Sequence, residues 1–323
     1  MSFQDLTLTD DSIDFRELAE QPADIERLVS AANFRGDVIE YMTGTGTMNG
    51  ATLPWGDTQD NIRFRPGEVS LWMGMNGHGK SLLTSQVFLD FIHQGQKVCI
   101  ASFEMKPKAT LARMARQAAM AASPTVDFID AFIDHSIGKL WLYDKQGNVD
   151  SANLLAIIRY AARKHGIQQF VIDSLMKCVK GEDDYNGQKD FVNSLCSTAQ
   201  DENLHIHLVH HSRKLADENQ LPGKMDAKGS GAVVDQVDQS FVVWRNKKKE
   251  EAVRAQAQTG KTDYDLTRPD AILRCDKNRH GEWEGSVGLY FSQGPLHYAR
   301  HQGRTNNGYD YTPYMKSEQG VAI

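Results

Sequence analysis

Long apolar runs, paired cysteines and an excess of basic residues are all missing from this chain of 323 residues. No run approaches the roughly 18 apolar residues that a membrane-spanning helix requires, so no membrane segment is predicted. The acidic N-terminus has neither the basic segment nor the apolar core of a secretory signal, which favours a cytoplasmic protein. Without any C-x-x-C spacing, the cysteines are predicted to be reduced core residues; they are Cys99, Cys178, Cys196 and Cys275.

The charge of the chain is unevenly distributed. The net charge of −6 does not indicate a nucleic-acid-binding protein, and residues 1–60 contain 12 acidic and only 3 basic side chains. Residues 205–280, in contrast, contain 14 basic and 11 acidic side chains. This separation permits a local basic channel inside an acidic protein, and it permits equally a solvated charged face.

A phosphate-binding motif occupies residues 74–81, which match the template G-x-x-x-x-G-K-[ST] at every fixed position. Its glycines let backbone N–H groups surround phosphate oxygens, Lys80 reaches the outer phosphates, and the Ser81 hydroxyl holds Mg²⁺. An apolar strand over 69–73 precedes the motif and a helical pattern over 82–92 follows it. This order of strand, glycine loop and helix directs a helix N-terminus at an anion. We therefore predict binding of ATP or another nucleoside triphosphate, with Mg²⁺, at Gly74, Met75, Asn76, Gly77, His78, Gly79, Lys80 and Ser81.

Predicted strands and helices alternate beyond residue 60, which is typical of an α/β fold with a mostly parallel twisted sheet and helices on both faces. Strands are expected at residues 69–73, 97–103, 140–143, 169–175, 205–210, 240–244, 271–276 and 288–291. Helices are expected at residues 82–92, 107–122, 151–165 and 187–203. The last strands follow one another without a long helix, so the sheet should end in an antiparallel extension.

The regions outside this alternation are expected to be less ordered. Residues 1–60 form an acidic segment with one or two short helices and a flexible linker, and 61–302 form the α/β domain. Residues 303–323 form a tail that is disordered or contacts a partner. Within the domain, residues 247–268 are polar throughout and predict an exposed insertion.

Two carboxylates follow predicted strands, where ligands bind in open α/β sheets. Asp173 ends the apolar strand 170–173 and can hold Mg²⁺ through its hydration shell, opposite Ser81, or serve as an ordinary turn cap. Glu104 follows the strand after the phosphate-binding helix. It can orient or deprotonate an attacking water, or be a solvated residue that opens the helix near Pro107.

Histidines and cations mark two further strand ends. His205, His207 and His211 share strand parity, so a metal site is conceivable, but no second pair at metal-ligand spacing accompanies them. His211 is better explained as a residue that senses the γ-phosphate. Lys277 and Arg279 follow another strand. They form either a solvated strand end or a cationic finger that is inserted into the nucleotide site of a neighbouring subunit. The basic glycine loop 224–231 is an ordinary surface loop or a phosphate-contacting loop for nucleic acid.

Together these segments resemble the RecA-like motor domain of DnaB-type replicative hexameric DNA helicases, over residues 66–298, and especially the phage primase–helicase and Twinkle-like branch. GMNGHGKS resembles the first nucleotide motif. SFEM resembles the segment with the catalytic base, here Glu104, and FVIDSL resembles the second nucleotide motif, which places Asp173 on Mg²⁺. LVHHSRK matches the sensor segment with His211, and DKNRHG matches the finger with Lys277 and Arg279. DAKGSGAVVDQVD is similar to the loop that grips DNA, here through Lys228, Gly229, Ser230 and Gly231.

The resemblance implies a RecA-like P-loop ATPase core that forms a hexameric ring, moves 5′-to-3′ on single-stranded DNA and unwinds duplex, with a primase or loader as possible replication partners. Two features depart from the family. An acidic segment of about 60 residues stands where relatives have a primase or helical collar, and Lys228 replaces an arginine, which reduces bidentate phosphate contact. The alternatives are a RecA-like recombination or regulatory ATPase without processive unwinding, and a nucleotide-dependent loader or inhibitor of another helicase.

Overall fold

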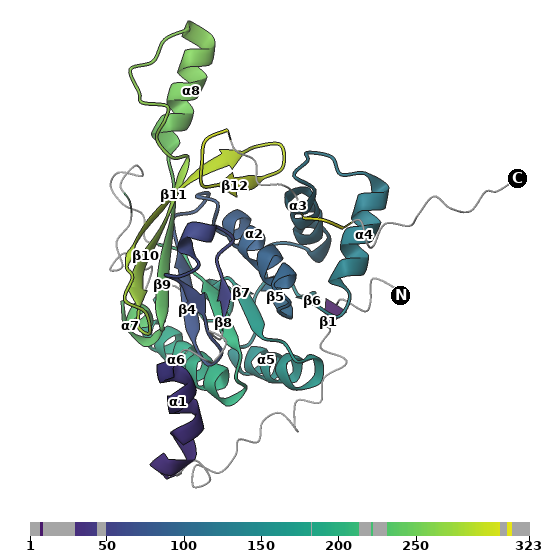
Figure 1. Ribbon diagram of the computed structural model, residues 1–323, viewed down its shortest axis with the longest axis vertical. Helices are drawn as coiled ribbons and strands as arrows, with labels where there is room; N and C mark the ends of the chain where they lie inside the picture. Colours follow the sequence, from purple (N-terminus) through teal and green to yellow (C-terminus); the bar gives the residue numbers. More distant parts are fainter. Residues whose placement is uncertain are drawn as a thin grey trace, which may run out of the picture.

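The computed structural model of the chain describes residues 7–8, 30–43, 50–181, 183–212, 221, 231–303 and 309–311. Its body is a ten-stranded sheet with helices against both faces (Figure 1). The strand order is β1-β6-β5-β7-β8-β4-β9-β10-β11-β12, and β2 and β3 form a separate small antiparallel sheet. The strands are β1 (Thr7–Leu8), β2 (Ala51–Thr52), β3 (Arg63–Phe64), β4 (Val69–Met73), β5 (Val98–Ser102), β6 (Leu140–Tyr143), β7 (Gln169–Asp173), β8 (His205–Val209), β9 (Gln239–Arg245), β10 (Ala271–Asn278), β11 (Gly285–Ser292) and β12 (His297–Ala299).

The helices fall between these strands, as the alternating pattern predicts. The α-helices are α1 (Arg35–Thr43), α2 (Lys80–His93), α3 (Pro107–Ala119), α4 (Val126–Ser136), α5 (Ser151–His165), α6 (Tyr185–Asp201), α7 (Ala232–Gln236) and α8 (Lys247–Thr259). Short 3₁₀ turns lie at Ala31–Phe34, Gly56–Thr58 and Leu175–Lys177. No helix in the described part of the chain is long and apolar enough to cross a membrane.

The sheet is parallel from β1 to β9 and antiparallel beyond it. β4 lies between β8 and β9, which pair with it in parallel. β9, β10, β11 and β12 then pair in antiparallel register, with an irregularity between Cys275 and Lys277. The predicted α/β fold is thus confirmed, including its mostly parallel sheet, helices on both faces and antiparallel extension.

Each face of the sheet covers its own hydrophobic core. Leu71 points into a core formed with α5 and α6, whereas its neighbour Trp72 points into a core formed with α2, α3 and α4. This alternation follows from the two-residue period of a strand that is buried on both faces. The second core also takes in Leu53, Trp55 and Phe64, so residues ahead of β4 pack as part of the domain body.

Three helices were not anticipated: α4, the short α7 and α8. α4 is capped by the Thr125 side chain, which accepts a hydrogen bond from the Phe128 backbone, and it buries Ala131 and Phe132. α8 lies in the segment expected to be a polar insertion. It projects away from the body, next to β9 and β11 (Figure 1), and only Lys249 on it is buried. The expected exposure is therefore correct, but the segment begins as a helix.

The buried histidines of β8 are structural. His207 accepts the Trp72 indole N–H at 3.2 Å and contacts Gln169 Oε1 at 2.9 Å, while His205 lies 2.7 Å from the Ser70 hydroxyl. Burial lowers the pKa of His205 to about 3 and that of His207 well below its ordinary value. Both are neutral members of a hydrogen-bonded core, and the described residues contain no group of three or more metal-ligating side chains.

The segment Tyr309–Tyr311 packs against the domain body. Tyr309 stacks on His93 and donates its hydroxyl to Asp90 at 2.8 Å, which ties it to the end of α2. Tyr311 is 1% exposed and packs edge-on against Phe128 of α4. Part of the expected tail therefore closes the core over α2 and α4.

Truncation of Tyr311 should destabilise the domain. We expect Tyr311→Ala to lower the free energy of unfolding by about 3–5 kcal/mol, because a large aromatic side chain leaves a cavity in a packed core. Tyr311→Phe is the matched control. Its effect should stay below about 1 kcal/mol, because the Tyr311 hydroxyl has no hydrogen-bond partner among the described residues. Urea unfolding of both variants measures the difference, and equal losses would show that the ring does not contribute to the core.

Candidate nucleotide-binding site

The phosphate-binding loop lies between β4 and α2. Gly79 has φ of 82°, in the left-handed region, and directly precedes Lys80, the first residue of α2. A Cβ atom at Gly79 would lie 2.8 Å from the Tyr298 hydroxyl, and one at Gly74 would overlap the Val243 carbonyl. The loop therefore needs glycine at both positions, and its shape leaves the first backbone N–H groups of α2 free to face an anion.

Lys80 is folded back onto its own loop. Its Nζ donates to the carbonyl oxygens of Gly74 at 2.8 Å and of Met75 at 3.1 Å. Burial lowers its pKa to about 8, against the opposing effect of the negative charges of Asp173 and Glu104. A bound polyphosphate would supply the missing negative charge, since a buried ammonium group is stabilised by an anion.

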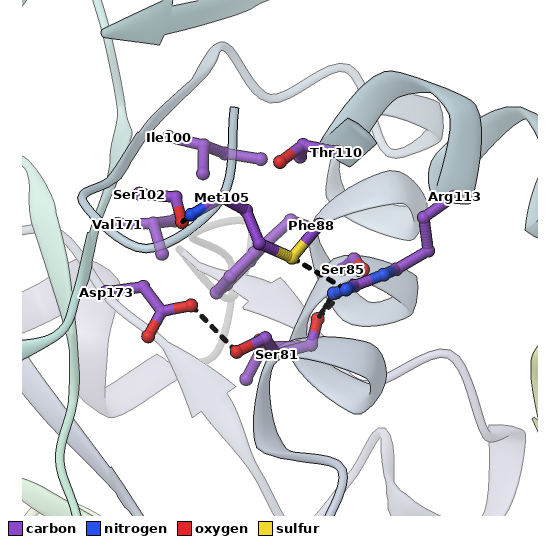
Figure 2. A pocket seen from close by; sticks show the side chains of 11 residues that line it. Ser81, Ser85, Phe88, Ile100, Ser102, Met105, Thr110, Arg113, Val171 and Asp173 are labelled. Atoms are coloured by element: carbon purple, nitrogen blue, oxygen red, sulfur yellow. Dashed lines mark hydrogen bonds between the residues drawn. The ribbon is translucent and has the colours of Figure 1, made fainter. Parts of the chain in front are cut away.

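Ser81 and Asp173 meet at the site, as predicted. The Ser81 hydroxyl donates to Asp173 Oδ2 at 2.8 Å, which joins the start of α2 to the end of β7 (Figure 2). Burial raises the pKa of Asp173, and the Ser81 hydrogen bond opposes that rise. A hydroxyl and a carboxylate side by side are oxygen ligands of the kind that Mg²⁺ takes together with water and phosphates, so the residues present fit that ion.

Glu104 and His211 also come together, from different strands. Glu104 Oε1 lies 3.3 Å from the Ser174 hydroxyl and 3.7 Å from His211 Nε2. The interaction with His211 holds the pKa of Glu104 below its ordinary value, so the carboxylate is ionised near neutral pH. Next to His211, the Ser212 backbone N–H donates to the Gly74 carbonyl at 3.0 Å. The end of β8 is therefore bonded to the phosphate-binding loop.

Arg113 of α3 was not singled out from the sequence. Its guanidinium donates to the Ser81 carbonyl at 2.8 Å and contacts the Met105 sulfur at 2.7 Å (Figure 2). It lines a small pocket with Asp173, between α2, α3 and the ends of the central strands. Helical spacing gave no signal for it, because an arginine on an amphipathic helix is ordinarily a solvated residue.

Arg245 is a second cation that the motifs missed. It ends β9, beside β4, and its guanidinium donates to the Gly77 carbonyl at 3.2 Å while pairing with Glu250 of α8. Its backbone N–H donates to His78 Nδ1 at 3.2 Å, so β9 also supports the loop. The available signal was its place at the end of a strand, the same signal that identified Glu104 and Asp173.

Lys277 and Arg279 lie at the opposite edge of the sheet. β10 runs antiparallel to β9, and β9 runs parallel to β4, so the end of β10 lies at the starting edge of β4. Asn278 pairs with Gln239, which pairs in turn with Ser70 at the beginning of β4. The phosphate-binding loop follows the other end of β4. The two cations therefore do not join the nucleotide site of their own subunit.

The predicted DNA-contacting residues are only partly described. Lys228, Gly229 and Ser230 lie outside the described residues, and Gly231 immediately precedes α7. The four cysteines are free thiols; Cys99, Cys178 and Cys275 are buried and Cys196 is partly buried. That arrangement agrees with their interpretation as core residues.

The fold and the loop geometry define a P-loop NTPase fold, and comparisons support that class. Residues 62–217 match a family model described as an AAA domain. A solved structure described as an ATPase domain superposes with a TM-score of 0.68 and 15% identity, over 84% of this chain and 99% of that chain. No curated protein matches this sequence significantly.

A second solved structure specifies the architecture further. "The Structure Of A DnaB-Like Replicative Helicase And Its Interactions With Primase" superposes with a TM-score of 0.65 and 15% identity, over 84% of this chain and 67% of that chain. The chain therefore has the RecA-like fold of DnaB-type helicase motor domains. The resemblance inferred from the sequence motifs is confirmed at the level of the fold.

Proposed function

We propose that this chain is the motor of an ATP-dependent DNA helicase, which forms a ring, moves 5′-to-3′ on single-stranded DNA and unwinds duplex. One observation carries the proposal. The phosphate loop, Asp173 and Glu104 converge at one edge of the sheet, while Lys277 and Arg279 lie at the other edge. A subunit built in this way needs a neighbour to complete its site.

In this proposal each converging group has a role in hydrolysis. Lys80 binds the outer phosphates, and Ser81 and Asp173 hold Mg²⁺, which neutralises phosphate charge when bound. Glu104, kept ionised by His211, orients the attacking water and accepts its proton. His211 contacts the γ-phosphate from the end of β8, whose neighbour Ser212 is bonded to the loop. Lys277 and Arg279 stabilise the transition-state charge in the adjacent subunit.

Single-stranded DNA is the proposed partner, gripped by residues 228–231. The segment contains one lysine among glycines and a serine, which suits contact with the phosphate backbone without base reading. Six such segments around a ring would follow one strand through a central channel. A primase or a loader is a further proposed partner, since the DnaB-like helicase that this chain resembles in fold is described together with primase.

Strand displacement on a forked duplex tests the proposal. We expect the wild-type protein to release the labelled strand from a fork with a 5′ single-stranded tail, in the presence of ATP and Mg²⁺. The control is Lys80→Ala, which removes the cation that contacts the outer phosphates and should abolish both hydrolysis and release.

The substrate with only a 3′ tail should not be unwound if the movement is 5′-to-3′. DNA-stimulated ATP hydrolysis without strand release on either fork would instead support the alternative, a RecA-like ATPase in recombination or regulation. Hydrolysis that DNA does not stimulate would contradict both functions.

A further inference from the structure

Asp238, at the junction between α7 and β9, is bonded to two parts of the molecule. Its Oδ2 accepts the Val69 backbone N–H at 2.9 Å, and its Oδ1 accepts a guanidinium N–H of Arg279 at 2.9 Å. The side chain is only 10% exposed. No role in the proposed hydrolysis has been given to this residue, although it ends the motif that begins at the DNA-contacting loop.

Arg279 is held at both its backbone and its side chain. Its backbone N–H donates to the Asp238 carbonyl at 2.9 Å. Its second guanidinium nitrogen donates to the carbonyls of Asp235 at 3.2 Å and Gln236 at 3.4 Å. Lys277 joins the same group, with Nζ at 3.0 Å from the Val234 carbonyl and 2.8 Å from the Asp235 carbonyl. Both cations are thus bonded to the last turn of α7.

These contacts restrict a flexible side chain without burying it. A free arginine side chain samples many rotamers, and a charged partner together with carbonyl acceptors fixes its planar group in one direction. The Arg279 side chain nevertheless remains 45% exposed. A guanidinium with five donors keeps some of them free for a further anion.

We propose that Asp238 is a positioning residue, which together with the carbonyl end of α7 sets the direction of the Arg279 guanidinium for use in the neighbouring subunit. This inference rests on the proposed function, because the Arg279 guanidinium that it positions acts only in the nucleotide site of a neighbouring subunit.

Asp238→Asn tests the inference, since asparagine keeps an oxygen acceptor for Val69 and loses the charge that faces Arg279. We expect DNA-stimulated kcat to fall about tenfold or more, while KM for ATP and the affinity for single-stranded DNA change less than about twofold. Asp238→Glu should recover part of the rate. Glu202→Gln is the matched control, because Glu202, at the end of α6, forms an ion pair with Arg163 of α5 that has similar exposure, 6% and 44%.

Mixed rings separate positioning of the finger from an effect on the subunit's own site. Asp238→Asn subunits should regain activity when mixed with Glu104→Gln subunits, because one kind of junction then combines an intact site with an intact finger. They should gain nothing from Arg279→Ala subunits, because both variants lack a competent finger.

Rescue of Arg279→Ala by Asp238→Asn, in rings whose wild type hydrolyses ATP, would overturn this inference alone. It would show that Asp238 acts through β4 on its own site. A wild type that assembles no rings or shows no DNA stimulation would overturn the proposed function, and this inference with it.

Discussion

Arg279→Ala rings should hydrolyse ATP about 10³–10⁵ times more slowly than wild-type rings, the range by which arginine fingers accelerate phosphoryl transfer. The reason is positional. Arg279 lies at the edge of the sheet opposite the phosphate-binding loop, so the substitution leaves the nucleotide site of the same subunit intact. What is lost is the positive charge that stabilises the transition state in the adjacent subunit's site. Steady-state ATPase rates measure the loss. Arg163→Ala is the matched control, since Arg163 is also an ion-paired, half-exposed arginine.

Subunit mixing decides whether the finger acts in the neighbour. Mixed with Glu104→Gln subunits, Arg279→Ala subunits should yield more ATPase activity than the sum of the two separate variants. A junction that combines the nucleotide site of an Arg279→Ala subunit with the finger of a Glu104→Gln subunit contains every group that hydrolysis needs. No rescue, with mixed assembly verified by native mass spectrometry, would show that Arg279 does not act across subunits.

Glu104→Gln should lower kcat by about 10²–10⁴-fold and leave nucleotide affinity within about threefold of wild type. The amide preserves the size of the side chain but cannot accept the proton of the attacking water, and general bases contribute about this factor. Single-turnover hydrolysis and equilibrium binding of a fluorescent ATP analogue measure the two quantities separately. Loss of binding with an unchanged rate would assign Glu104 a structural role.

A carboxylate remote from the nucleotide site provides the control for this variant. Glu251→Gln removes the same charge from the exposed surface of α8, where the side chain lies outside the nucleotide site. Its hydrolysis rate should equal that of the wild type within error. A similar loss in both variants would indicate a general effect of net charge.

The longer strands and the nucleotide motifs were predictable because their residues obey local rules, whereas the short strands β1, β2, β3 and β12 were not predicted. β4, β5, β6, β7 and β8 are buried on both faces, so each is a short, mainly apolar run, although β8 also contains the hydrogen-bonded His205 and His207. The glycine loop needs its residues at fixed spacing for close contact between backbone and phosphate. Strand ends bring Asp173, Glu104 and His211 together in a parallel sheet whatever their separation in sequence.

The two longer unpredicted helices, α8 and α4, break those rules for physical reasons. α8 is stabilised at its ends, by the Asn246 cap and by Gly260 in the left-handed conformation, and not by an apolar face. A search for helical periodicity finds nothing in such a segment. α4 has an apolar face, but acidic residues interrupt it, and its burial depends on Tyr311, which is far away in the sequence.

Contacts between side chains of distant elements could not be predicted from the sequence. Asp238 follows a recognised motif, yet nothing in the order of residues brings it to Arg279, because that pairing depends on the register of β9 and β10. The same holds for Arg113 and Arg245, whose positions beside the loop follow from helix packing and strand order.

The phosphate-binding loop and the finger lie at opposite edges of one sheet, and this placement determines how many complete nucleotide sites an assembly contains. If each complete site is formed by two adjacent subunits, the number of sites equals the number of junctions and not the number of chains. An open row of subunits leaves a loop without a finger at one end and a finger without a loop at the other. Closing that row adds one junction and no protein, so the activity per chain rises at the moment of closure.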